Sequence, residues 1–149
     1  MIMSIKDKIN SDLKDAMRAR DQKKLSALRL ITAAIKQIEV DERIDVDETR
    51  MLVILDKMVK QRNESIAQFT AANRTDLVEQ EEFELSVINQ YMPEPLSETE
   101  IANAVEQAIS TVKAEKMSDM GRVMAELKPQ LQGRADMSKV SAMIKARLN

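Results

Sequence analysis

Apolar residues recur every three or four positions along almost the whole chain, and this spacing is the strongest constraint on its fold. Ile5, Ile9 and Leu13 form one such series, and another runs from Leu25 to Ile38. This repeat puts the apolar side chains on one face of an α-helix, whereas a half-buried strand requires strict alternation. The chain is also rich in Ala, Leu, Lys, Glu, Gln and Met, which favour helices. The sequence therefore predicts an all-α protein.

Residues that commonly cap helix N-termini precede the apolar series and divide the chain into seven predicted helices. The predicted caps are Ser4 or Asp7, Asp21, Asp47, Thr75, Ser97, Ser118 and Asp136. Residues 41–46 are charged and lose the repeat, so they are expected to form a loop. Asn73 is expected to end the third helix in a left-handed conformation.

Pro93 and Pro95 mark the clearest boundary in the chain. Proline cannot continue a helix, and it pushes the preceding residue out of the α region. We therefore expect an N-terminal domain, 1–92, in which four helices form a bundle of hairpins. A small domain of three helices is expected over 96–149, and its first helix begins with a capping box of Ser97 and Glu100.

Several residue types that carry enzyme chemistry are absent or rare. There is no Cys and no His, which excludes thiolate nucleophiles, histidine bases and the commonest zinc ligands. The two glycines, Gly121 and Gly133, come too late and too far apart for a phosphate-binding loop. The composition predicts no cofactor, no metal and no catalytic residues, and it argues against a self-sufficient enzyme.

Long apolar segments are also absent from the sequence. No apolar run approaches the roughly 18–20 residues that a bilayer requires, so no membrane association is expected. The first residues lack the apolar core of a secretory signal peptide. A cytoplasmic location is the expectation that follows by default.

Charge is distributed unevenly along the predicted C-terminal domain. Residues 93–115 hold five acidic residues and one Lys, whereas residues 116–149 hold seven basic residues and three acidic ones. A basic surface attracts phosphates by releasing counterions, without reading sequence. The candidate RNA-binding residues are Arg122, Lys128, Arg134, Lys139 and Lys145. Charge alone favours the alternative, an ordinary solvated helix face.

The final segment, DMGRVMAELKPQLQGRAD followed by KVSAMIKARL, is the most specific motif in the chain. It resembles the YqeY family and the related tail domain of the B subunit (GatB) of the tRNA-dependent amidotransferase. The segments LRLITAAIK, KMVKQRNESIAQF and INQYMPEPLSETEI also resemble YqeY proteins, so the similarity covers nearly the whole chain. Ala125 and Met137 depart from the pattern, because glycine is frequent at both positions in the family.

This resemblance implies a helical N-terminal region and a three-helix tail. In the amidotransferase the tail domain helps to grip the tRNA, while the catalytic parts of that glutamine-dependent carbon–nitrogen ligase lie elsewhere and have no counterpart here. The resemblance thus implies a non-catalytic accessory module, with tRNA or a tRNA-processing or amidotransferase-type protein as partner. A protein–protein adaptor that uses the helical hairpin is the alternative. An amidotransferase-type enzyme is disfavoured.

The GRAD turn and the small residues before it have competing interpretations. Gly133 is expected to supply a positive φ and Asp136 to cap the last helix, which leaves Arg134 for phosphate. Gly121 lies four residues before Ala125, and this spacing favours close packing of another backbone in the core. Contact with an RNA backbone at Gly121 is the alternative.

One charged pair falls within the apolar stripes of the two central helices. Arg62 lies between Val59 and Ile66, and Glu81 occupies the matching place in the next helix. A guanidinium that loses solvent requires a partner, so Arg62 is predicted to pair with Glu81 or with Glu84. A structural ion pair is favoured over a catalytic one, because nothing in the sequence indicates a cleft.

Overall fold

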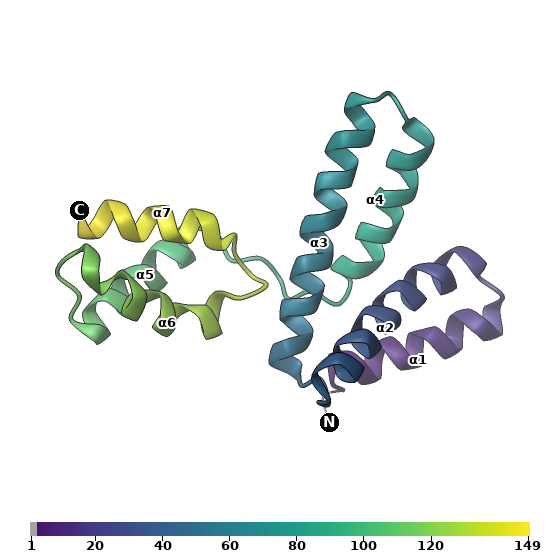
Figure 1. Ribbon diagram of the computed structural model, residues 1–149, viewed down its shortest axis with the longest axis horizontal. Helices are drawn as coiled ribbons and strands as arrows, with labels where there is room; N and C mark the ends of the chain where they lie inside the picture. The colour runs from purple at the N-terminus through teal and green to yellow at the C-terminus, as the bar shows by residue number, and fades with distance from the viewer. Residues whose placement is uncertain (1–2) are drawn as a thin grey trace. The chain divides into compact units, whose positions relative to one another are not determined.

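The computed structural model describes residues 3–149, and all regular secondary structure within that range is helical (Figure 1). Seven α-helices and one short 3₁₀ helix form, and none of these residues lies in a strand. The prediction of an all-α protein is confirmed. The chain divides into two compact units, Met1–Met92 and Pro93–Asn149, which are described separately below.

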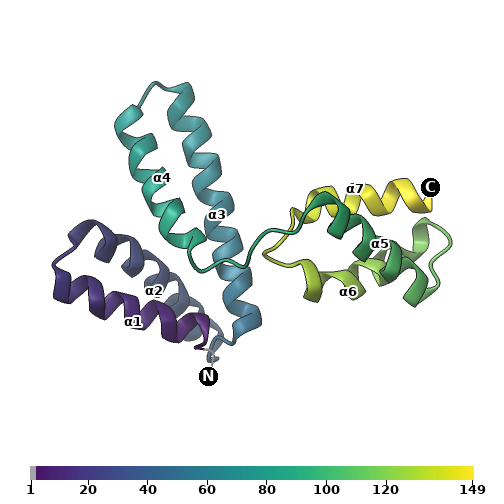
Figure 2. The ribbon, with the colours of Figure 1, turned by 180° about the vertical axis from the view of Figure 1, so that it is seen from behind.

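The N-terminal unit consists of two antiparallel helical hairpins (Figures 1 and 2). One hairpin contains α1 (Ile5–Ala19) and α2 (Gln22–Glu42), and the other contains α3 (Glu48–Ala71) and α4 (Thr75–Asn89). The hairpins pack against each other at one end and separate toward their far tips.

Side-chain caps begin three of these helices as predicted. The Ser4 hydroxyl accepts a hydrogen bond from the Asp7 amide, and Asp21 and Asp47 cap α2 and α3 in the same way. Two expectations were wrong. Helix α2 continues to Glu42, two residues into the predicted loop, and Thr75 is the first residue of α4 rather than its cap.

The core of the N-terminal unit lies where the two hairpins meet. Its fully buried large side chains come from all four helices: Ile9, Leu28, Ile31, Met51, Leu55 and Ile88. Beyond Val59 the α3–α4 hairpin lacks a third layer, because none of the described side chains from Lys60 to Ser86 is buried. The far half of this hairpin therefore packs only on itself and presents broad faces to solvent.

The C-terminal unit is a three-helix module with its own core. It contains α5 (Glu98–Val112), a 3₁₀ helix (Met117–Asp119), α6 (Met120–Leu131) and α7 (Met137–Leu148). The buried residues are Val105, Ala108, Val123, Leu127, Leu131, Val140, Ile144 and Leu148. All three helices contribute to this core, so each presents a second, exposed face to solvent.

The helix starts of the C-terminal unit are well defined. The predicted capping box forms, because the Ser97 hydroxyl accepts from the Glu100 amide and the Glu100 carboxylate accepts from the Ser97 amide. Ser118 does not cap α6. It lies inside the 3₁₀ helix, and Asp119 occupies the position before α6.

Candidate functional site

The turn between α6 and α7 brings several of the predicted site residues together. Gly133 has a φ of 79°, a left-handed conformation that glycine accepts without strain. The Asp136 carboxylate accepts a hydrogen bond of 2.9 Å from the Ser138 amide and so caps α7. Both residues therefore shape the turn in which Arg134 is held.

Arg134 has a structural duty that the sequence argument missed. Its Nε donates to the Glu94 carbonyl oxygen at 3.2 Å, and its own carbonyl oxygen accepts from the Leu96 amide at 2.9 Å. These two bonds clasp the α6–α7 turn to the segment that leads into α5. The expectation that Arg134 has no structural duty is therefore wrong, whereas its contact with phosphate stays a prediction.

The guanidinium of Arg122 forms hydrogen bonds within the C-terminal unit. It donates to Asp119 Oδ1 at 2.7 Å and to the Val112 carbonyl oxygen at 3.0 Å. Asp119 also accepts from the backbone amides of Glu115 and Lys116. The pKa of Asp119 is lowered to about 2 by the hydrogen bonds that its carboxylate accepts, first from the Glu115 amide, then from the Arg122 guanidinium and the Lys116 amide. Arg122 thus helps to fix the connection between α5 and α6.

The acidic and basic halves of this unit neutralise each other in part. Arg147 of α7 forms a bidentate pair with Glu106 of α5, and the bond from Nη2 to Oε2 measures 2.6 Å. The hydrogen bond from Arg147 holds the pKa of Glu106 below its usual value. This pair reduces the separation of charge that the sequence indicates.

Three of the predicted RNA-binding residues have exposed side chains that form no ion pair with the described residues. Lys128, Lys139 and Lys145 are exposed, and none of them forms an ion pair with the residues described here. Lys128 lies near the end of α6 and Lys139 near the start of α7, on either side of the turn that holds Arg134. Lys145 is six residues beyond Lys139, which puts the two about 120° apart around the helix axis.

A shallow groove of about 340 Å³ runs beside Arg134 in the C-terminal unit. Its polar lining includes the amide side chains of Asn103, Gln107 and Gln130, and Leu131 is one of its apolar residues. Amide groups both donate and accept hydrogen bonds. The groove therefore offers neutral polar contacts beside one cation, Arg134, and one carboxylate, Glu100, which also lines it.

The expectation for Gly121 is corrected by the structure. Gly121 is exposed, and a Cβ built there would meet no atom within 4 Å. No other backbone packs closely at this position, so the core-packing interpretation is wrong. This side of α6 is open to solvent.

Arg62 contacts Glu84, the second of its two predicted partners. Arg62 Nε lies 3.5 Å from Glu84 Oε2, and the two side chains are only 15% and 13% exposed. The distance fits an ion pair, but Nε has no partner in hydrogen-bond geometry. Glu81 forms no ion pair with Arg62 within the distance of a salt bridge. Burial raises the pKa of Glu81, and the nearby negative charge of Glu84 raises it further.

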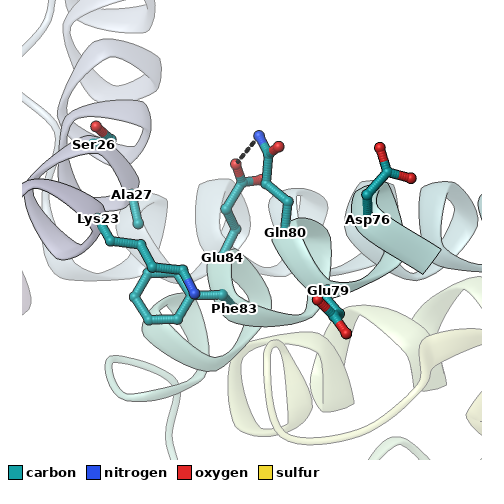
Figure 3. A pocket seen from close by; sticks show the side chains of 8 residues that line it. All are labelled: Lys23, Ser26, Ala27, Asp76, Glu79, Gln80, Phe83 and Glu84. Carbon is teal, nitrogen blue, oxygen red and sulfur yellow. Dashed lines mark hydrogen bonds between the residues drawn. The ribbon is translucent and has the colours of Figure 1, made fainter. Parts of the chain in front are cut away.

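A cleft that the sequence did not predict lies between α2 and α4 (Figure 3). It encloses about 400 Å³ and is lined by Lys23, Ser26, Ala27, Asp76, Glu79, Gln80, Phe83 and Glu84. The Lys23 amino group lies 4.2 Å from the centroid of the Phe83 ring, within cation–π range. The spacing of the α4 residues along one helix face is the signal that could have indicated this surface.

Residues 3–149 contain neither a cluster of metal-ligating side chains nor a helix that could span a membrane. No three carboxylates among them converge as a metal ion would require. No helix in the same range combines the length and the apolar character needed to cross a bilayer.

The chain is similar to fungal proteins named "Altered inheritance of mitochondria protein 41, mitochondrial". It is 40% identical to the protein of Candida glabrata over 62% of this chain and 52% of that one. The protein of Lachancea thermotolerans is 36% identical over 70% of this chain and 58% of its own length. The protein of Pyrenophora tritici-repentis is 32% identical over 81% and 70%, respectively. The chain thus spans little more than half of the first two relatives.

These relatives correct the expected location. Each of them is named as a mitochondrial protein, which contradicts the cytoplasmic expectation. The absence of a secretory signal peptide does not determine the location, because mitochondrial import depends on a different kind of segment, amphipathic and rich in Arg.

The chain also matches the model of a protein family. The family model described as "Yqey-like protein" matches residues 6–148, which is nearly the whole chain and includes both helical units. The resemblance carried by the final segment therefore extends to the N-terminal hairpins as well. The chain belongs to the YqeY-like family.

Proposed function

We propose that this chain is a non-catalytic accessory module that binds tRNA through its C-terminal unit. The observation that carries the proposal is the presence of Lys128, Lys139 and Lys145 as exposed, uncommitted cations. They lie in the part of the chain that resembles the tRNA-gripping tail of the amidotransferase B subunit. Family membership, which covers both units, supports the same assignment.

The contacts in this proposal are mainly with phosphates. Lys128 and Lys139 flank the α6–α7 turn, and each lysine neutralises a phosphate and releases counterions. Arg134 adds a cation beside the groove that contains Asn103, Gln107 and Gln130, whose amides can bond to ribose hydroxyls or base edges. The described aromatic rings all lie in the other unit, so recognition depends on shape and backbone rather than on stacking.

Arg122 and Gly121 have secondary roles in this proposal. Arg122 is exposed, but RNA binding would compete with its bonds to Asp119 and the Val112 carbonyl. Gly121 lies on an open side of α6, where a partner backbone can approach without meeting a side chain. We therefore assign the main phosphate contacts to the three lysines.

A charge-reversal experiment tests the proposal. The triple variant Lys128→Glu, Lys139→Glu, Lys145→Glu is compared with Lys14→Glu, Lys36→Glu, Lys57→Glu, which makes the same charge change at exposed lysines of the other unit. Binding to tRNA is measured over a salt series, and circular dichroism checks the helicity. We expect only the first variant to lose affinity, with a salt slope reduced by roughly 0.7–0.9 for each lost phosphate contact. Equal affinities for both variants would refute the proposal.

The absence of catalysis is tested separately. The chain has no Cys or His, and its resemblance is to the tail of the amidotransferase rather than to its catalytic parts. We expect the purified protein to show no glutaminase and no transamidation activity. Robust glutamine turnover that copurifies with the protein and scales with its concentration would contradict this.

A protein adaptor is the second candidate, and exposed apolar side chains favour it. Val40 is 63% exposed, and Ile44 and Val53 together line a surface hollow of about 390 Å³. If this surface binds a protein, then Val53→Asp should abolish a complex that survives nuclease treatment, while Lys57→Glu on the same helix should not.

A further inference from the structure

We propose that the cleft between α2 and α4 binds a basic amphipathic helix of a partner protein. Lys or Arg side chains of that helix would meet the acidic face of α4, and an apolar side chain would cover Phe83. This inference goes beyond the proposed function, because it concerns the other unit and a different class of partner.

The cleft presents one continuous face of α4. The residues that α4 contributes are Asp76, Glu79, Gln80, Phe83 and Glu84. These positions are related by steps of three and four residues, so they lie on one face of α4 over about two turns of the helix. Figure 3 shows Phe83 and Glu84 beside Lys23 and Ala27 of α2, with Asp76 and Gln80 along one edge of this face and Glu79 along the other. A partner helix laid along this face would contact acidic and aromatic groups in turn.

The cleft is lined by three carboxylates, those of Asp76, Glu79 and Glu84, and by one cation, Lys23. Helix α4 contains Asp76, Glu79, Glu81, Glu82 and Glu84 and no basic residue. Arg74 engages Asp76, and Arg62 lies beside Glu84. Glu79 forms no ion pair with any described residue and lines the cleft directly. Glu79 is therefore the lining carboxylate that a Lys or Arg side chain of a partner would complement.

Phe83 provides the apolar part of the surface. Its ring is covered on the cleft side by the Lys23 amino group, 4.2 Å from the ring centroid. Lys23 thus already places one ammonium group on the Phe83 ring, and the apolar side chain of the partner would pack on the part of the ring that remains accessible. None of the described side chains from Lys60 to Ser86 is buried. A docked helix would therefore supply the third layer of packing that the far half of the α3–α4 hairpin lacks.

Peptide binding to the full-length protein tests this inference. The probe is a fluorescent amphipathic helical peptide with Arg on one face and Leu on the other, and a second peptide replaces each Arg with Glu. Glu79→Lys alters the cleft, and Glu82→Lys makes the same change on the same helix, at an exposed residue that does not line the cleft. Fluorescence anisotropy gives the affinities.

We expect Glu79→Lys to weaken binding of the Arg peptide by about tenfold and Glu82→Lys to change it by less than about twofold. The Glu peptide should not bind. Equal losses in the two variants would reveal attraction to net charge alone and would overturn the inference, as would equal binding of both peptides.

Hydrogen exchange supplies an independent readout that needs no variant. Binding of the Arg peptide should slow amide exchange in α4 and in the first turn of α2, around Lys23. Protection confined to other helices would also overturn the inference. Neither result affects the tRNA proposal, because the lysines of that proposal lie in the C-terminal unit.

Discussion

The phenol hydroxyl of Tyr91 donates a hydrogen bond of 2.5 Å to Oδ2 of Asp12, a residue 79 positions earlier in the chain. The bond joins α1 to the segment that directly follows α4. Tyr91 is only 5% exposed, and the Lys8 amino group lies 5.9 Å from its ring centroid. The last residues of the N-terminal unit are thereby fastened to its first helix.

Removal of this hydroxyl should destabilise the N-terminal unit. In Tyr91→Phe the ring still fills its place, but Asp12 loses a donor in a partly buried setting. We expect a loss of about 1–2 kcal/mol in the free energy of unfolding, measured by urea denaturation. Asp12→Asn keeps an acceptor and should cost less, whereas a neutral Tyr91→Phe variant would show that the bond contributes nothing.

Tyr91 is the single tyrosine of the chain, so its ionisation can be followed directly by ultraviolet absorbance. Burial, the hydrogen bond to Asp12 and the Asp12 charge all raise the pKa of Tyr91. The unfolded chain should form phenolate near pH 10, and the native protein only at higher pH. Because the native pKa is the higher one, this group's contribution to stability is complete below about pH 10 and falls as the pH rises further.

The stability of the C-terminal unit should depend on Asp119 at low pH. The pKa of Asp119 falls from its ordinary value of 3.8 to about 2 in the folded protein. Between these values the unfolded state binds more protons, so the contribution of Asp119 is present above about pH 4 and is lost as the pH falls toward 2. Thermal unfolding as a function of pH should show this loss in the native protein.

Asp119→Asn tests this dependence. The variant should be less stable than the native protein at neutral pH, and the difference should vanish near pH 2. Glu126→Gln is the control, since Glu126 forms no ion pair with any described residue. A gap between Asp119→Asn and native protein that stays constant with pH would argue against this assignment.

The two glycines should respond in opposite ways to replacement by alanine. Gly121 lies in α6 with open space around it, so Gly121→Ala should stabilise the helix by up to about 1 kcal/mol. Gly133 has a φ of 79°, so Gly133→Ala should cost roughly 1–2 kcal/mol. Thermal melts of the pair provide the comparison, and a gain in stability from Gly133→Ala would contradict the role given to its backbone.

Local features of the fold could be predicted from the sequence because they depend on near neighbours. The series from Leu25 to Ile38 defines the buried face of α2, and Ile31 and Ile35 are buried as their spacing requires. The capping box of Ser97 and Glu100 involves residues three positions apart. The 3₁₀ helix before α6 was missed, because Ser118 is an equally good cap by residue type.

The candidate sites were less predictable because they depend on tertiary contacts. The Arg147–Glu106 pair joins residues 41 positions apart, and the Arg134–Glu94 bond joins residues 40 apart. Neither separation has a local signature, so neither contact could be predicted from the sequence. The cleft beside Phe83 arises from the divergence of two hairpins, which helical periodicity does not encode.

The clasp of Arg134 on Glu94 and Leu96 has a mechanical consequence. Tension applied along the chain between the two units would reach the α6–α7 turn through these bonds before it loaded the first turn of α5. The α6–α7 turn, which lies between Lys128 and Lys139, would therefore receive part of any pull on Glu94.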